Sequence, residues 1–193
     1  ERVHNTQAFI DLVYTLSRRP PLGGNKLGVL TMSGGAGVLM ADAAADHGLE
    51  LTPLPDDARK SLDERNPFGA SGNPVDTTAQ AVNDMTLVRD ALRVMLDQGG
   101  HDAVASFFMN WPANPSLGPR LREAIAEGIQ GFDDRTVAIA LNAGEDVKAD
   151  FDRSGLLVFD DPTFAVDALA ASARIGKRLR EPVPSLAPIQ QRP

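Results

Sequence analysis

Cysteine is absent from the chain of 193 residues, which excludes disulfide bonds and cysteine-based catalysis. Aromatic residues are scarce, with one tryptophan (Trp111) and one tyrosine (Tyr14). No apolar run approaches the roughly 18 residues of a membrane-spanning helix, and no signal peptide is recognisable. We therefore expect a cytoplasmic protein that has no membrane partner.

Basic clusters are also absent, and acidic residues outnumber basic ones by 26 to 19, for a net charge of −7. This balance argues against nucleic acid and anionic membranes as partners. Hydrophobic residues make up 42% of the chain, which is enough for a complete core. The chain begins with Glu1 rather than Met, so we expect a piece of a longer polypeptide.

Short apolar runs alternate along the chain with segments of helical pattern. The runs are continuous rather than alternating, as is typical of strands covered on both faces. We predict a flavodoxin-like doubly wound α/β domain of three layers, with five parallel strands near residues 27–30, 49–52, 103–109, 136–141 and 156–159. This domain should span residues 25–180, after a lead-in helix and linker (1–24) and before a proline-rich tail (181–193).

The most informative stretch is the small-residue turn after the first expected strand, which comprises Ser33, Gly34, Gly35, Ala36 and Gly37. Glycines let the backbone approach a ligand closely. The first N–H groups of the following helix, together with the positive end of its dipole, form an anion site. We expect a phosphate, a phosphorylated side chain or a carboxylate at this turn.

The turn matches two other phosphate-binding motifs poorly. A dinucleotide fingerprint would need a small residue at position 40, which is Met40, and a phosphate-binding P-loop would need a following Lys-Ser/Thr pair. A tight structural turn without a ligand stays open. Ser33 is interpreted as a helix cap or an anion contact, because no general base can be assigned to it.

A second rigid segment runs from Asn73 to Asp76, with the sequence NPVD. Pro74 fixes one backbone angle and forces Asn73 into an extended conformation. One interpretation is a plain Asx-turn. The other is that the loop shapes the rim of the anion site and directs Asn73 and Asp76 toward it.

The remaining polar positions are less informative. Asn142 begins the loop after the fourth expected strand, at the same sheet edge as the turn, and Glu145 and Asp146 are best explained as a helix start. His4, His47 and His101 all lie away from that edge. No metal-binding pattern and no catalytic triad is present, so neither a metal site nor a catalytic residue is predicted in this chain. Trp111 is equally compatible with lining a pocket and with filling space.

These motifs together resemble the NDP-forming acyl-CoA synthetases, the family of ADP-forming acetate–CoA ligase and succinyl-CoA synthetase. The resemblance rests on GNKLGVLT (24–31), SGGAGVL (33–39), ADA (41–43), GLEL (48–51) and NPVD (73–76), and it extends from about Phe9 to Lys177. Within that family, the chain looks like the second flavodoxin-like CoA-ligase domain.

The resemblance implies a mechanism in which acyl phosphate, CoA and an enzyme phosphohistidine are interconverted, with ATP or GTP made or used. Ser33 to Gly37 would hold the phosphohistidine, supported by Asn73, Asp76 and Asn142. CoA and ATP/ADP with Mg would belong to the full enzyme. The partners would be a phosphohistidine-bearing CoA-ligase domain, a CoA-binding domain and an ATP-grasp domain, in the same or a partner chain.

This chain also departs from the family. It has no loop like Ser-His-Thr-Gly-Ser, and Met32 replaces an expected Asn in the turn. The fragment alone should therefore be inactive. The alternative function is a non-catalytic nucleotide- or CoA-sensing or interaction module, for example of an acetyltransferase fusion. A flavin carrier has support from the fold alone.

Overall fold

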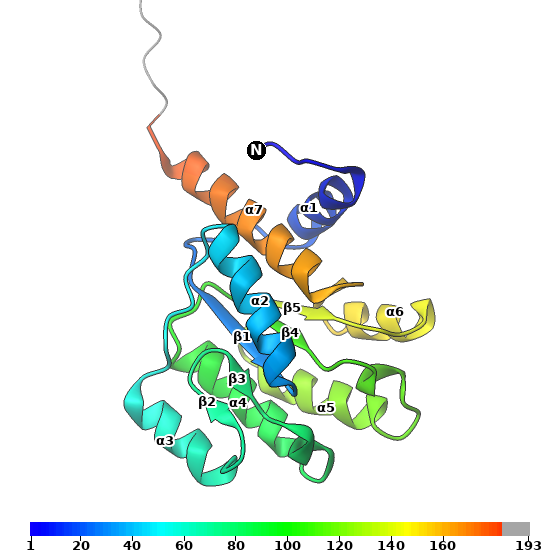
Figure 1. Cartoon of the computed structure of the whole chain (residues 1–193). Helices are drawn as coiled ribbons and strands as arrows, with labels where there is room; N and C mark the ends of the chain where they lie inside the picture. The colour runs from blue at the N-terminus through cyan, green and yellow to red at the C-terminus, as the bar shows by residue number, and fades with distance from the viewer. Residues whose placement is uncertain (183–193) are drawn as a thin grey trace, which may run out of the picture.

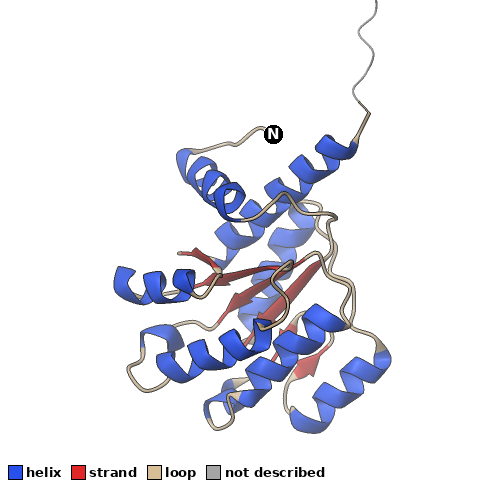
Figure 2. Cartoon of the chain, turned by 180° about the vertical axis from the view of Figure 1, so that it is seen from behind, coloured by secondary structure: helices blue, strands red, loops and turns tan. Residues whose placement is uncertain are grey.

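The computed structural model of the chain describes residues 1–182 and places a central sheet between two layers of helices (Figures 1 and 2). The sheet has six strands in the order β2-β3-β1-β4-β5-β6. All neighbouring strands are parallel except β2 and β3. The strands are β1 (Leu27–Thr31), β2 (Ala70–Ser71), β3 (Val75–Asp76), β4 (Ala103–Phe107), β5 (Thr136–Ala140) and β6 (Leu157–Phe159).

Seven α-helices and two short 3₁₀ turns connect these strands in the described residues. They are α1 (Thr6–Arg18), α2 (Gly34–Asp46), α3 (Asp56–Arg65), η1 (Ala79–Val82), α4 (Thr86–Asp97), η2 (Trp111–Ala113), α5 (Gly118–Ile129), α6 (Glu145–Arg153) and α7 (Pro162–Arg180). Several helix starts follow from the sequence. Asn5 caps α1 by accepting from the amide of Ala8, and Asp161 caps α7 by accepting from the amide of Thr163.

Each face of the sheet has its own apolar cluster. Leu30 and Val104 pack with α3, α4 and α5 on one face, while Val29 and Ala105 pack with α2 and α7 on the other. Successive side chains of a strand point to opposite faces, so continuous apolar runs are needed to build both clusters. The predicted α/β fold of three layers is confirmed, and the helix α1 lies outside it, against α7 (Figure 1).

Five strands of the sheet are parallel, as predicted, but one of them is not the expected segment, and β2 adds a sixth, antiparallel strand. Residues 49–52 form no strand, and only Glu50 makes an isolated bridge, to Lys26. Pro53 and Pro55 follow at once, and proline cannot donate a ladder hydrogen bond. The edge of β1 is instead covered by β3, which pairs at Leu30 and Thr31, and β2 adds a short antiparallel edge.

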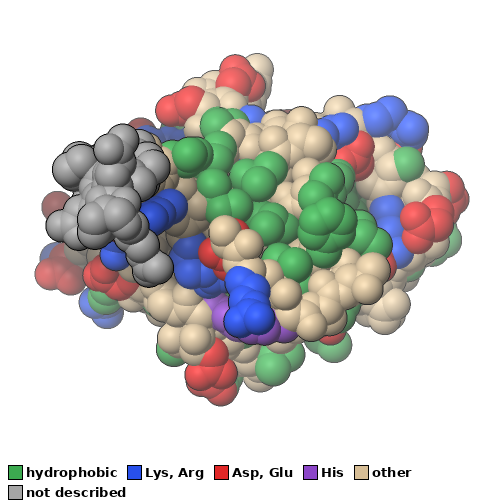
Figure 3. All heavy atoms as spheres, turned by 90° about the horizontal axis from the view of Figure 1, so that it is seen from above, with side chains coloured by type: hydrophobic (Ala, Val, Ile, Leu, Met, Phe, Trp, Pro, Cys, Tyr) green, Lys and Arg blue, Asp and Glu red, His purple; other side chains and the backbone are tan. Residues whose placement is uncertain are grey.

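Helix α1 buries only part of its apolar surface. Leu12 is buried, whereas Phe9, Ile10 and Val13 are each at least half exposed. The reason is that α1 packs mainly on the single helix α7, with a few contacts to β6. Figure 3 shows hydrophobic side chains gathered on this upper face of the molecule.

Two further expectations concern the ends and the surroundings of the domain. Most of the proline-rich tail lies outside the described residues, which end two residues after α7 and Arg180. None of the helices in residues 1–182 is both long and apolar enough to cross a membrane.

Candidate functional site

The turn between β1 and α2 is fixed by Thr31, a fully buried residue at the end of the strand. Its hydroxyl donates to the carbonyl of Phe107 on β4 (3.0 Å) and accepts from the amide of Ser33 (3.2 Å). A buried hydroxyl that both donates and accepts a hydrogen bond holds its neighbours in one geometry. The direction in which α2 leaves the sheet is therefore set by Thr31.

The first three amide groups of α2, those of Gly34, Gly35 and Ala36, have no hydrogen-bond partner among residues 1–182. Gly34 and Gly35 are exposed, so their N–H groups are accessible from solvent. Ser33 precedes the helix in an extended conformation, and its side chain accepts no hydrogen bond from the helix. The Ser33 cap is thus not observed, and the positive end of the helix dipole is open to a ligand.

The three glycines of the turn have different surroundings. A Cβ on Gly35 would meet nothing closer than the Ser33 hydroxyl at 4.0 Å. A Cβ on Gly37 would lie 3.2 Å from Pro74 and 3.4 Å from Thr31, and the Gly37 amide already donates to the Ser33 carbonyl. Gly37 therefore allows close packing of the helix on the NPVD loop, while Gly34 and Gly35 border open space.

Asn73 points into the sheet and not toward the site. Its Oδ1 accepts from the amide of Val29 (2.9 Å), and its Nδ2 donates to the carbonyls of Leu27 (2.7 Å) and Thr52 (3.0 Å). It thus occupies the gap on β1 between the bridge at Glu50 and the short strand β3. The expectation that Asn73 is directed at the rim is wrong, because the missing strand leaves backbone groups of β1 that need partners.

Asp76 makes the Asx-turn that the sequence suggested and also lies beside the helix start. Its Oδ1 accepts from the amide of Thr78 (2.8 Å). Its Oδ2 is 3.5 Å from the place that a Cβ on Gly34 would occupy. One carboxylate oxygen is therefore held by the loop, and the other faces the first turn of α2.

Other residues at this edge contribute less. Asn142 is exposed after β5, two strands from β1, which corresponds to about 10 Å. Trp111 is buried and stacks on Phe108, so it fills space in the core. Glu145 and Asp146 occupy the first turn of α6. Hydrogen bonds from Lys148 to Asp160 and Glu145 raise the pKa of that lysine.

The histidines lie away from this edge. His101 is buried, its Nε2 donates to the Thr52 carbonyl (3.1 Å), and its Nδ1 has no partner in the described part of the chain. His47 ends α2 and pairs with Asp167 on α7 (2.8 Å). Burial raises the pKa of Asp167, and the nearby His47 and Arg174 partly oppose this change.

Sequence reasoning missed the roles of Thr31 and Pro74 in forming the turn. The sequence offers a weak signal for Thr31, since threonine hydroxyls often bond nearby backbone groups, here the amide of Ser33 two residues later. Pro74 could not be paired with Gly37, because the two residues meet only through the tertiary fold.

Comparison with known proteins identifies the fold around this turn. The family model of the Ligase-CoA domain matches residues 27–160, which is more than two thirds of the chain. The chain belongs to the Ligase-CoA domain family. The matched segment begins with β1 and ends after β6, so it contains the α2 turn and the loop that packs against it.

Two curated relatives of this Ligase-CoA domain are ADP-forming acetate–CoA ligases. The chain is 28% identical over 177 residues to the alpha subunit of acetate–CoA ligase [ADP-forming] I of Pyrococcus furiosus, covering 88% of this chain and 37% of that subunit. It is 30% identical over 90 residues to the acetate–CoA ligase [ADP-forming] of Methanocaldococcus jannaschii, covering 47% of this chain and 12% of that protein. The chain thus spans well under half the length of these relatives.

Solved structures share the fold. A protein of Pyrococcus horikoshii OT3 matches with a TM-score of 0.81 at 22% identity, over 93% of this chain and 42% of that one. The dinucleotide forming acetyl-coenzyme A synthetase 1 of Ca. Korarchaeum cryptofilum, solved in complex with phosphate and ADP, matches with a TM-score of 0.73 at 22% identity, over 91% of this chain and 38% of that one.

Proposed function

We propose that this chain is a domain of an NDP-forming acyl-CoA synthetase, and that the N-terminus of α2 receives the phosphoryl group of a phosphohistidine carried by another domain. The full reaction would convert an acid, CoA and ATP to acyl-CoA, ADP and phosphate. The observation that carries the proposal is the row of three unpartnered amides at Gly34, Gly35 and Ala36 in a Ligase-CoA domain.

The chemistry of the turn suits a phosphoryl dianion. Three N–H donors and one helix dipole point to the same space, and an exposed helix dipole alone stabilises a negative charge by about 0.3–1 kcal/mol. Charge-assisted hydrogen bonds from the amides add to this. The donors are fixed by Thr31 before the phosphate arrives, so little reorganisation is needed on binding.

Asp76 and Asn142 would support the site in different ways. An imidazole phosphorylated on one ring nitrogen carries an N–H on the other when it is protonated there. The Oδ2 atom of Asp76, beside Gly34, can accept a hydrogen bond from that N–H group and so orient the imidazole ring. Asn142 is exposed at the same sheet edge and could donate to the outer side of the incoming group.

The remaining groups of the reaction would be held elsewhere. Within residues 1–182 no group of three His, Asp or Glu side chains is arranged to hold a metal ion. The full reaction also uses Mg and a nucleotide. We assign them to an ATP-grasp domain, and CoA to a CoA-binding domain, in the same or a partner chain. Residues 25–180 would form the docking domain, with 1–24 as lead-in and 181–193 as tail.

The experiment that tests the proposal is co-expression of the chain with the missing domains, followed by measurement of phosphohistidine turnover and of CoA- and nucleotide-dependent acyl-CoA formation. Gly35→Val adds a side chain where the phosphate would approach, in space that the fold leaves open. Loss of access to one or more donors should slow turnover by about tenfold or more.

Ala45→Val is the matched control, because Ala45 is exposed near the other end of α2. If both variants turn over the phosphohistidine at the same rate, the role assigned to the turn is wrong. Tight binding of a free nucleotide or of CoA by this chain alone, measured by calorimetry, would instead favour the sensing module. The proposal predicts only weak phosphate binding by the isolated chain.

A further inference from the structure

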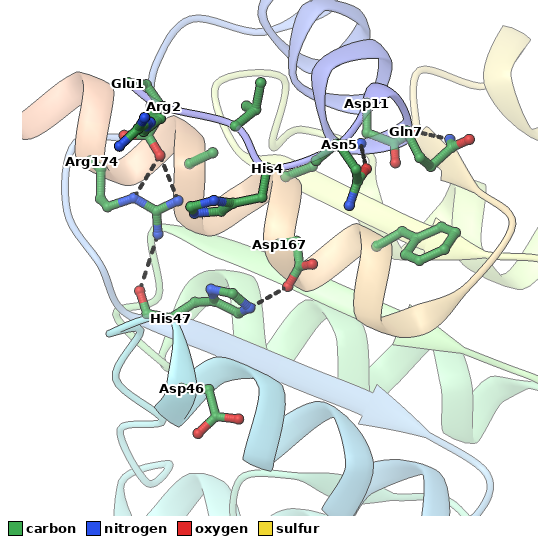
Figure 4. A pocket seen from close by; sticks show the side chains of 15 residues that line it. Glu1, Arg2, His4, Asn5, Gln7, Asp11, Asp46, His47, Asp167 and Arg174 are labelled. Carbon is green, nitrogen blue, oxygen red and sulfur yellow. Dashed lines mark hydrogen bonds and ion pairs between the residues drawn. The ribbon is translucent and has the colours of Figure 1, made fainter.

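A cavity of about 670 Å³ lies far from the α2 turn, on the outer side of the helical layer that contains α2 and α7 (Figure 4). Its walls are the segment before α1, one face of α1, one face of α7, and the last residues of α2. Helix α2 has 13 residues, so the cavity and the candidate anion site are about 20 Å apart at opposite ends of it. The volume lies in the usual range of small-molecule sites, about 300–1,000 Å³.

Part of the cavity wall is apolar. Phe164, Ala168 and Ala171 repeat along α7 at a spacing that places them on one face of the helix, and Val3 and Ala8 lie across from them. Phe164 is among the exposed large hydrophobic side chains, with 37% of its surface accessible. An apolar ligand group would remove this ring from water.

The cations on the helices around the cavity are already engaged. Arg174 donates to the carboxylate of Glu1 (2.7 Å) and to the carbonyl of His47 (3.3 Å). His47 in turn contacts Asp167 (2.8 Å). Figure 4 shows these contacts as one connected row along the cavity. Arg2 and His4 also reach the cavity, from the exposed segment before α1.

Asp11 on α1 and Asp46 at the end of α2 are the carboxylates of the cavity that pair with no cation of residues 1–182, and of these two only Asp11 is partly buried. Asp160 pairs with Lys148, and Asp161 caps α7. The side chain of Asp11 receives only a hydrogen bond from the amide of Gln7 (3.0 Å), and no cation of residues 1–182 pairs with it. Burial raises the pKa of Asp11, and the carboxylates of Asp160 and Asp167 act in the same direction. A positive charge beside Asp11 would stabilise its ionised carboxylate and so oppose both the burial and the neighbouring negative charges.

We propose that this cavity binds an organic ammonium ion, with its charged nitrogen against Asp11 and near Asp167, and its apolar part against Phe164 and the alanines of α7. The ring of Phe164 adds a favourable face for the cation. The inference stands independently of the proposed function, because it uses other residues and the opposite end of α2.

The test is isothermal titration of the full 193-residue chain with 2-phenylethylammonium and with its neutral counterpart 2-phenylethanol, at neutral pH. The ammonium ion should bind, and the alcohol should bind about tenfold more weakly or worse. Asp11→Asn should abolish this difference. Asp42→Asn, an exposed change on α2 outside the cavity, should leave it intact.

Circular dichroism checks that each variant is folded. Asp167→Asn provides the second carboxylate variant and should weaken ammonium binding as well. Equal affinity for the amine and the alcohol, unchanged binding in Asp11→Asn, or no binding of the amine at millimolar concentration would each overturn the inference.

Discussion

The side-chain oxygen of Asn73 lies 2.9 Å from the amide nitrogen of Val29 and takes the place of a strand partner. The same side chain donates to the carbonyls of Leu27 and Thr52. The side-chain amide of Asn73 therefore completes the edge of β1 where residues 49–52 do not pair as a strand. It also anchors the start of the NPVD loop, on which Gly37 of α2 packs through Pro74.

Asn73→Ala should lower the free energy of unfolding by about 2–4 kcal/mol, because it leaves the N–H of Val29 and the carbonyl of Leu27 without partners and removes one of the two donors to the Thr52 carbonyl. Urea denaturation followed by circular dichroism measures the change. Asn142→Ala is the control, since Asn142 is exposed and has no hydrogen bond in the described structure, and it should change stability by less than about 0.5 kcal/mol. Similar losses in the two variants would show that Asn73 does not complete the sheet.

Gly37→Ala and Gly35→Ala form a matched pair in one helix. The new methyl group at position 37 would lie 3.2 Å from Pro74 and force α2 away from the loop, at a cost of about 1–3 kcal/mol. At position 35 the methyl group has room, and alanine favours the helix, so stability should be unchanged or higher. Thermal unfolding distinguishes the two. Equal melting temperatures would contradict the packing role given to Gly37.

Thr31→Val keeps the shape of a fully buried side chain but removes its hydroxyl. The amide of Ser33 and the carbonyl of Phe107 would each lose a partner, which should cost about 1–3 kcal/mol. The turn should also become less ordered, so hydrogen exchange at the amides of Ser33 and Gly37, which are both hydrogen-bonded in the turn, should accelerate. Unchanged exchange at both positions would show that Thr31 does not fix the turn.

Tyr14 links α1 to the sheet, and its titration should be visible in the stability of the protein. Its hydroxyl donates to Asp152 (2.7 Å) and accepts from the amide of Val158 (3.0 Å). Burial, and then the hydrogen bond to Asp152, raise the pKa of Tyr14 to about 12. The folded state therefore prefers the neutral phenol, and its contribution is complete below the unfolded pKa of about 10.

The free energy of unfolding should fall as the pH rises from about 10 toward 12, and Tyr14→Phe should remove this part of the dependence. Denaturant titrations across that range measure it in both proteins. A parallel decline in the two proteins would mean that other groups cause it.

Much of the fold could be predicted from the sequence, because the relevant signals are local. Continuous apolar runs predicted the long central strands, and the glycine turn predicted that a helix follows β1 directly. The edge of the sheet could not be predicted, because Leu49 to Thr52 resemble a strand as well as residues 75–76 do. The segment that pairs with β1 is decided by tertiary contacts: Val75 pairs with Leu30, the side chain of Asn73 bonds Val29, and Pro53 ends the competing segment.

The candidate site could likewise be predicted only where its features depend on local sequence. The open amides of the turn follow from the local pattern of small residues. The prediction that Asn73 faces the site fails, because the direction of a side chain cannot be deduced from a loop sequence. The cavity beside Asp11 was not predicted at all, since it brings together residues 1–11, 46–47 and 164–174 from three distant segments.

The measurement that tests the central claim most directly is an NMR titration of the labelled chain with phosphate at constant ionic strength. The account predicts that the largest amide shifts occur at Gly34, Gly35 and Ala36, and that Gly34→Pro reduces the affinity. Proline is tolerated at the first position of a helix but lacks the N–H group, and Ser33 is already extended, as a residue before proline must be. Phosphate shifts that fall elsewhere, or that persist unchanged in Gly34→Pro, would contradict the claim.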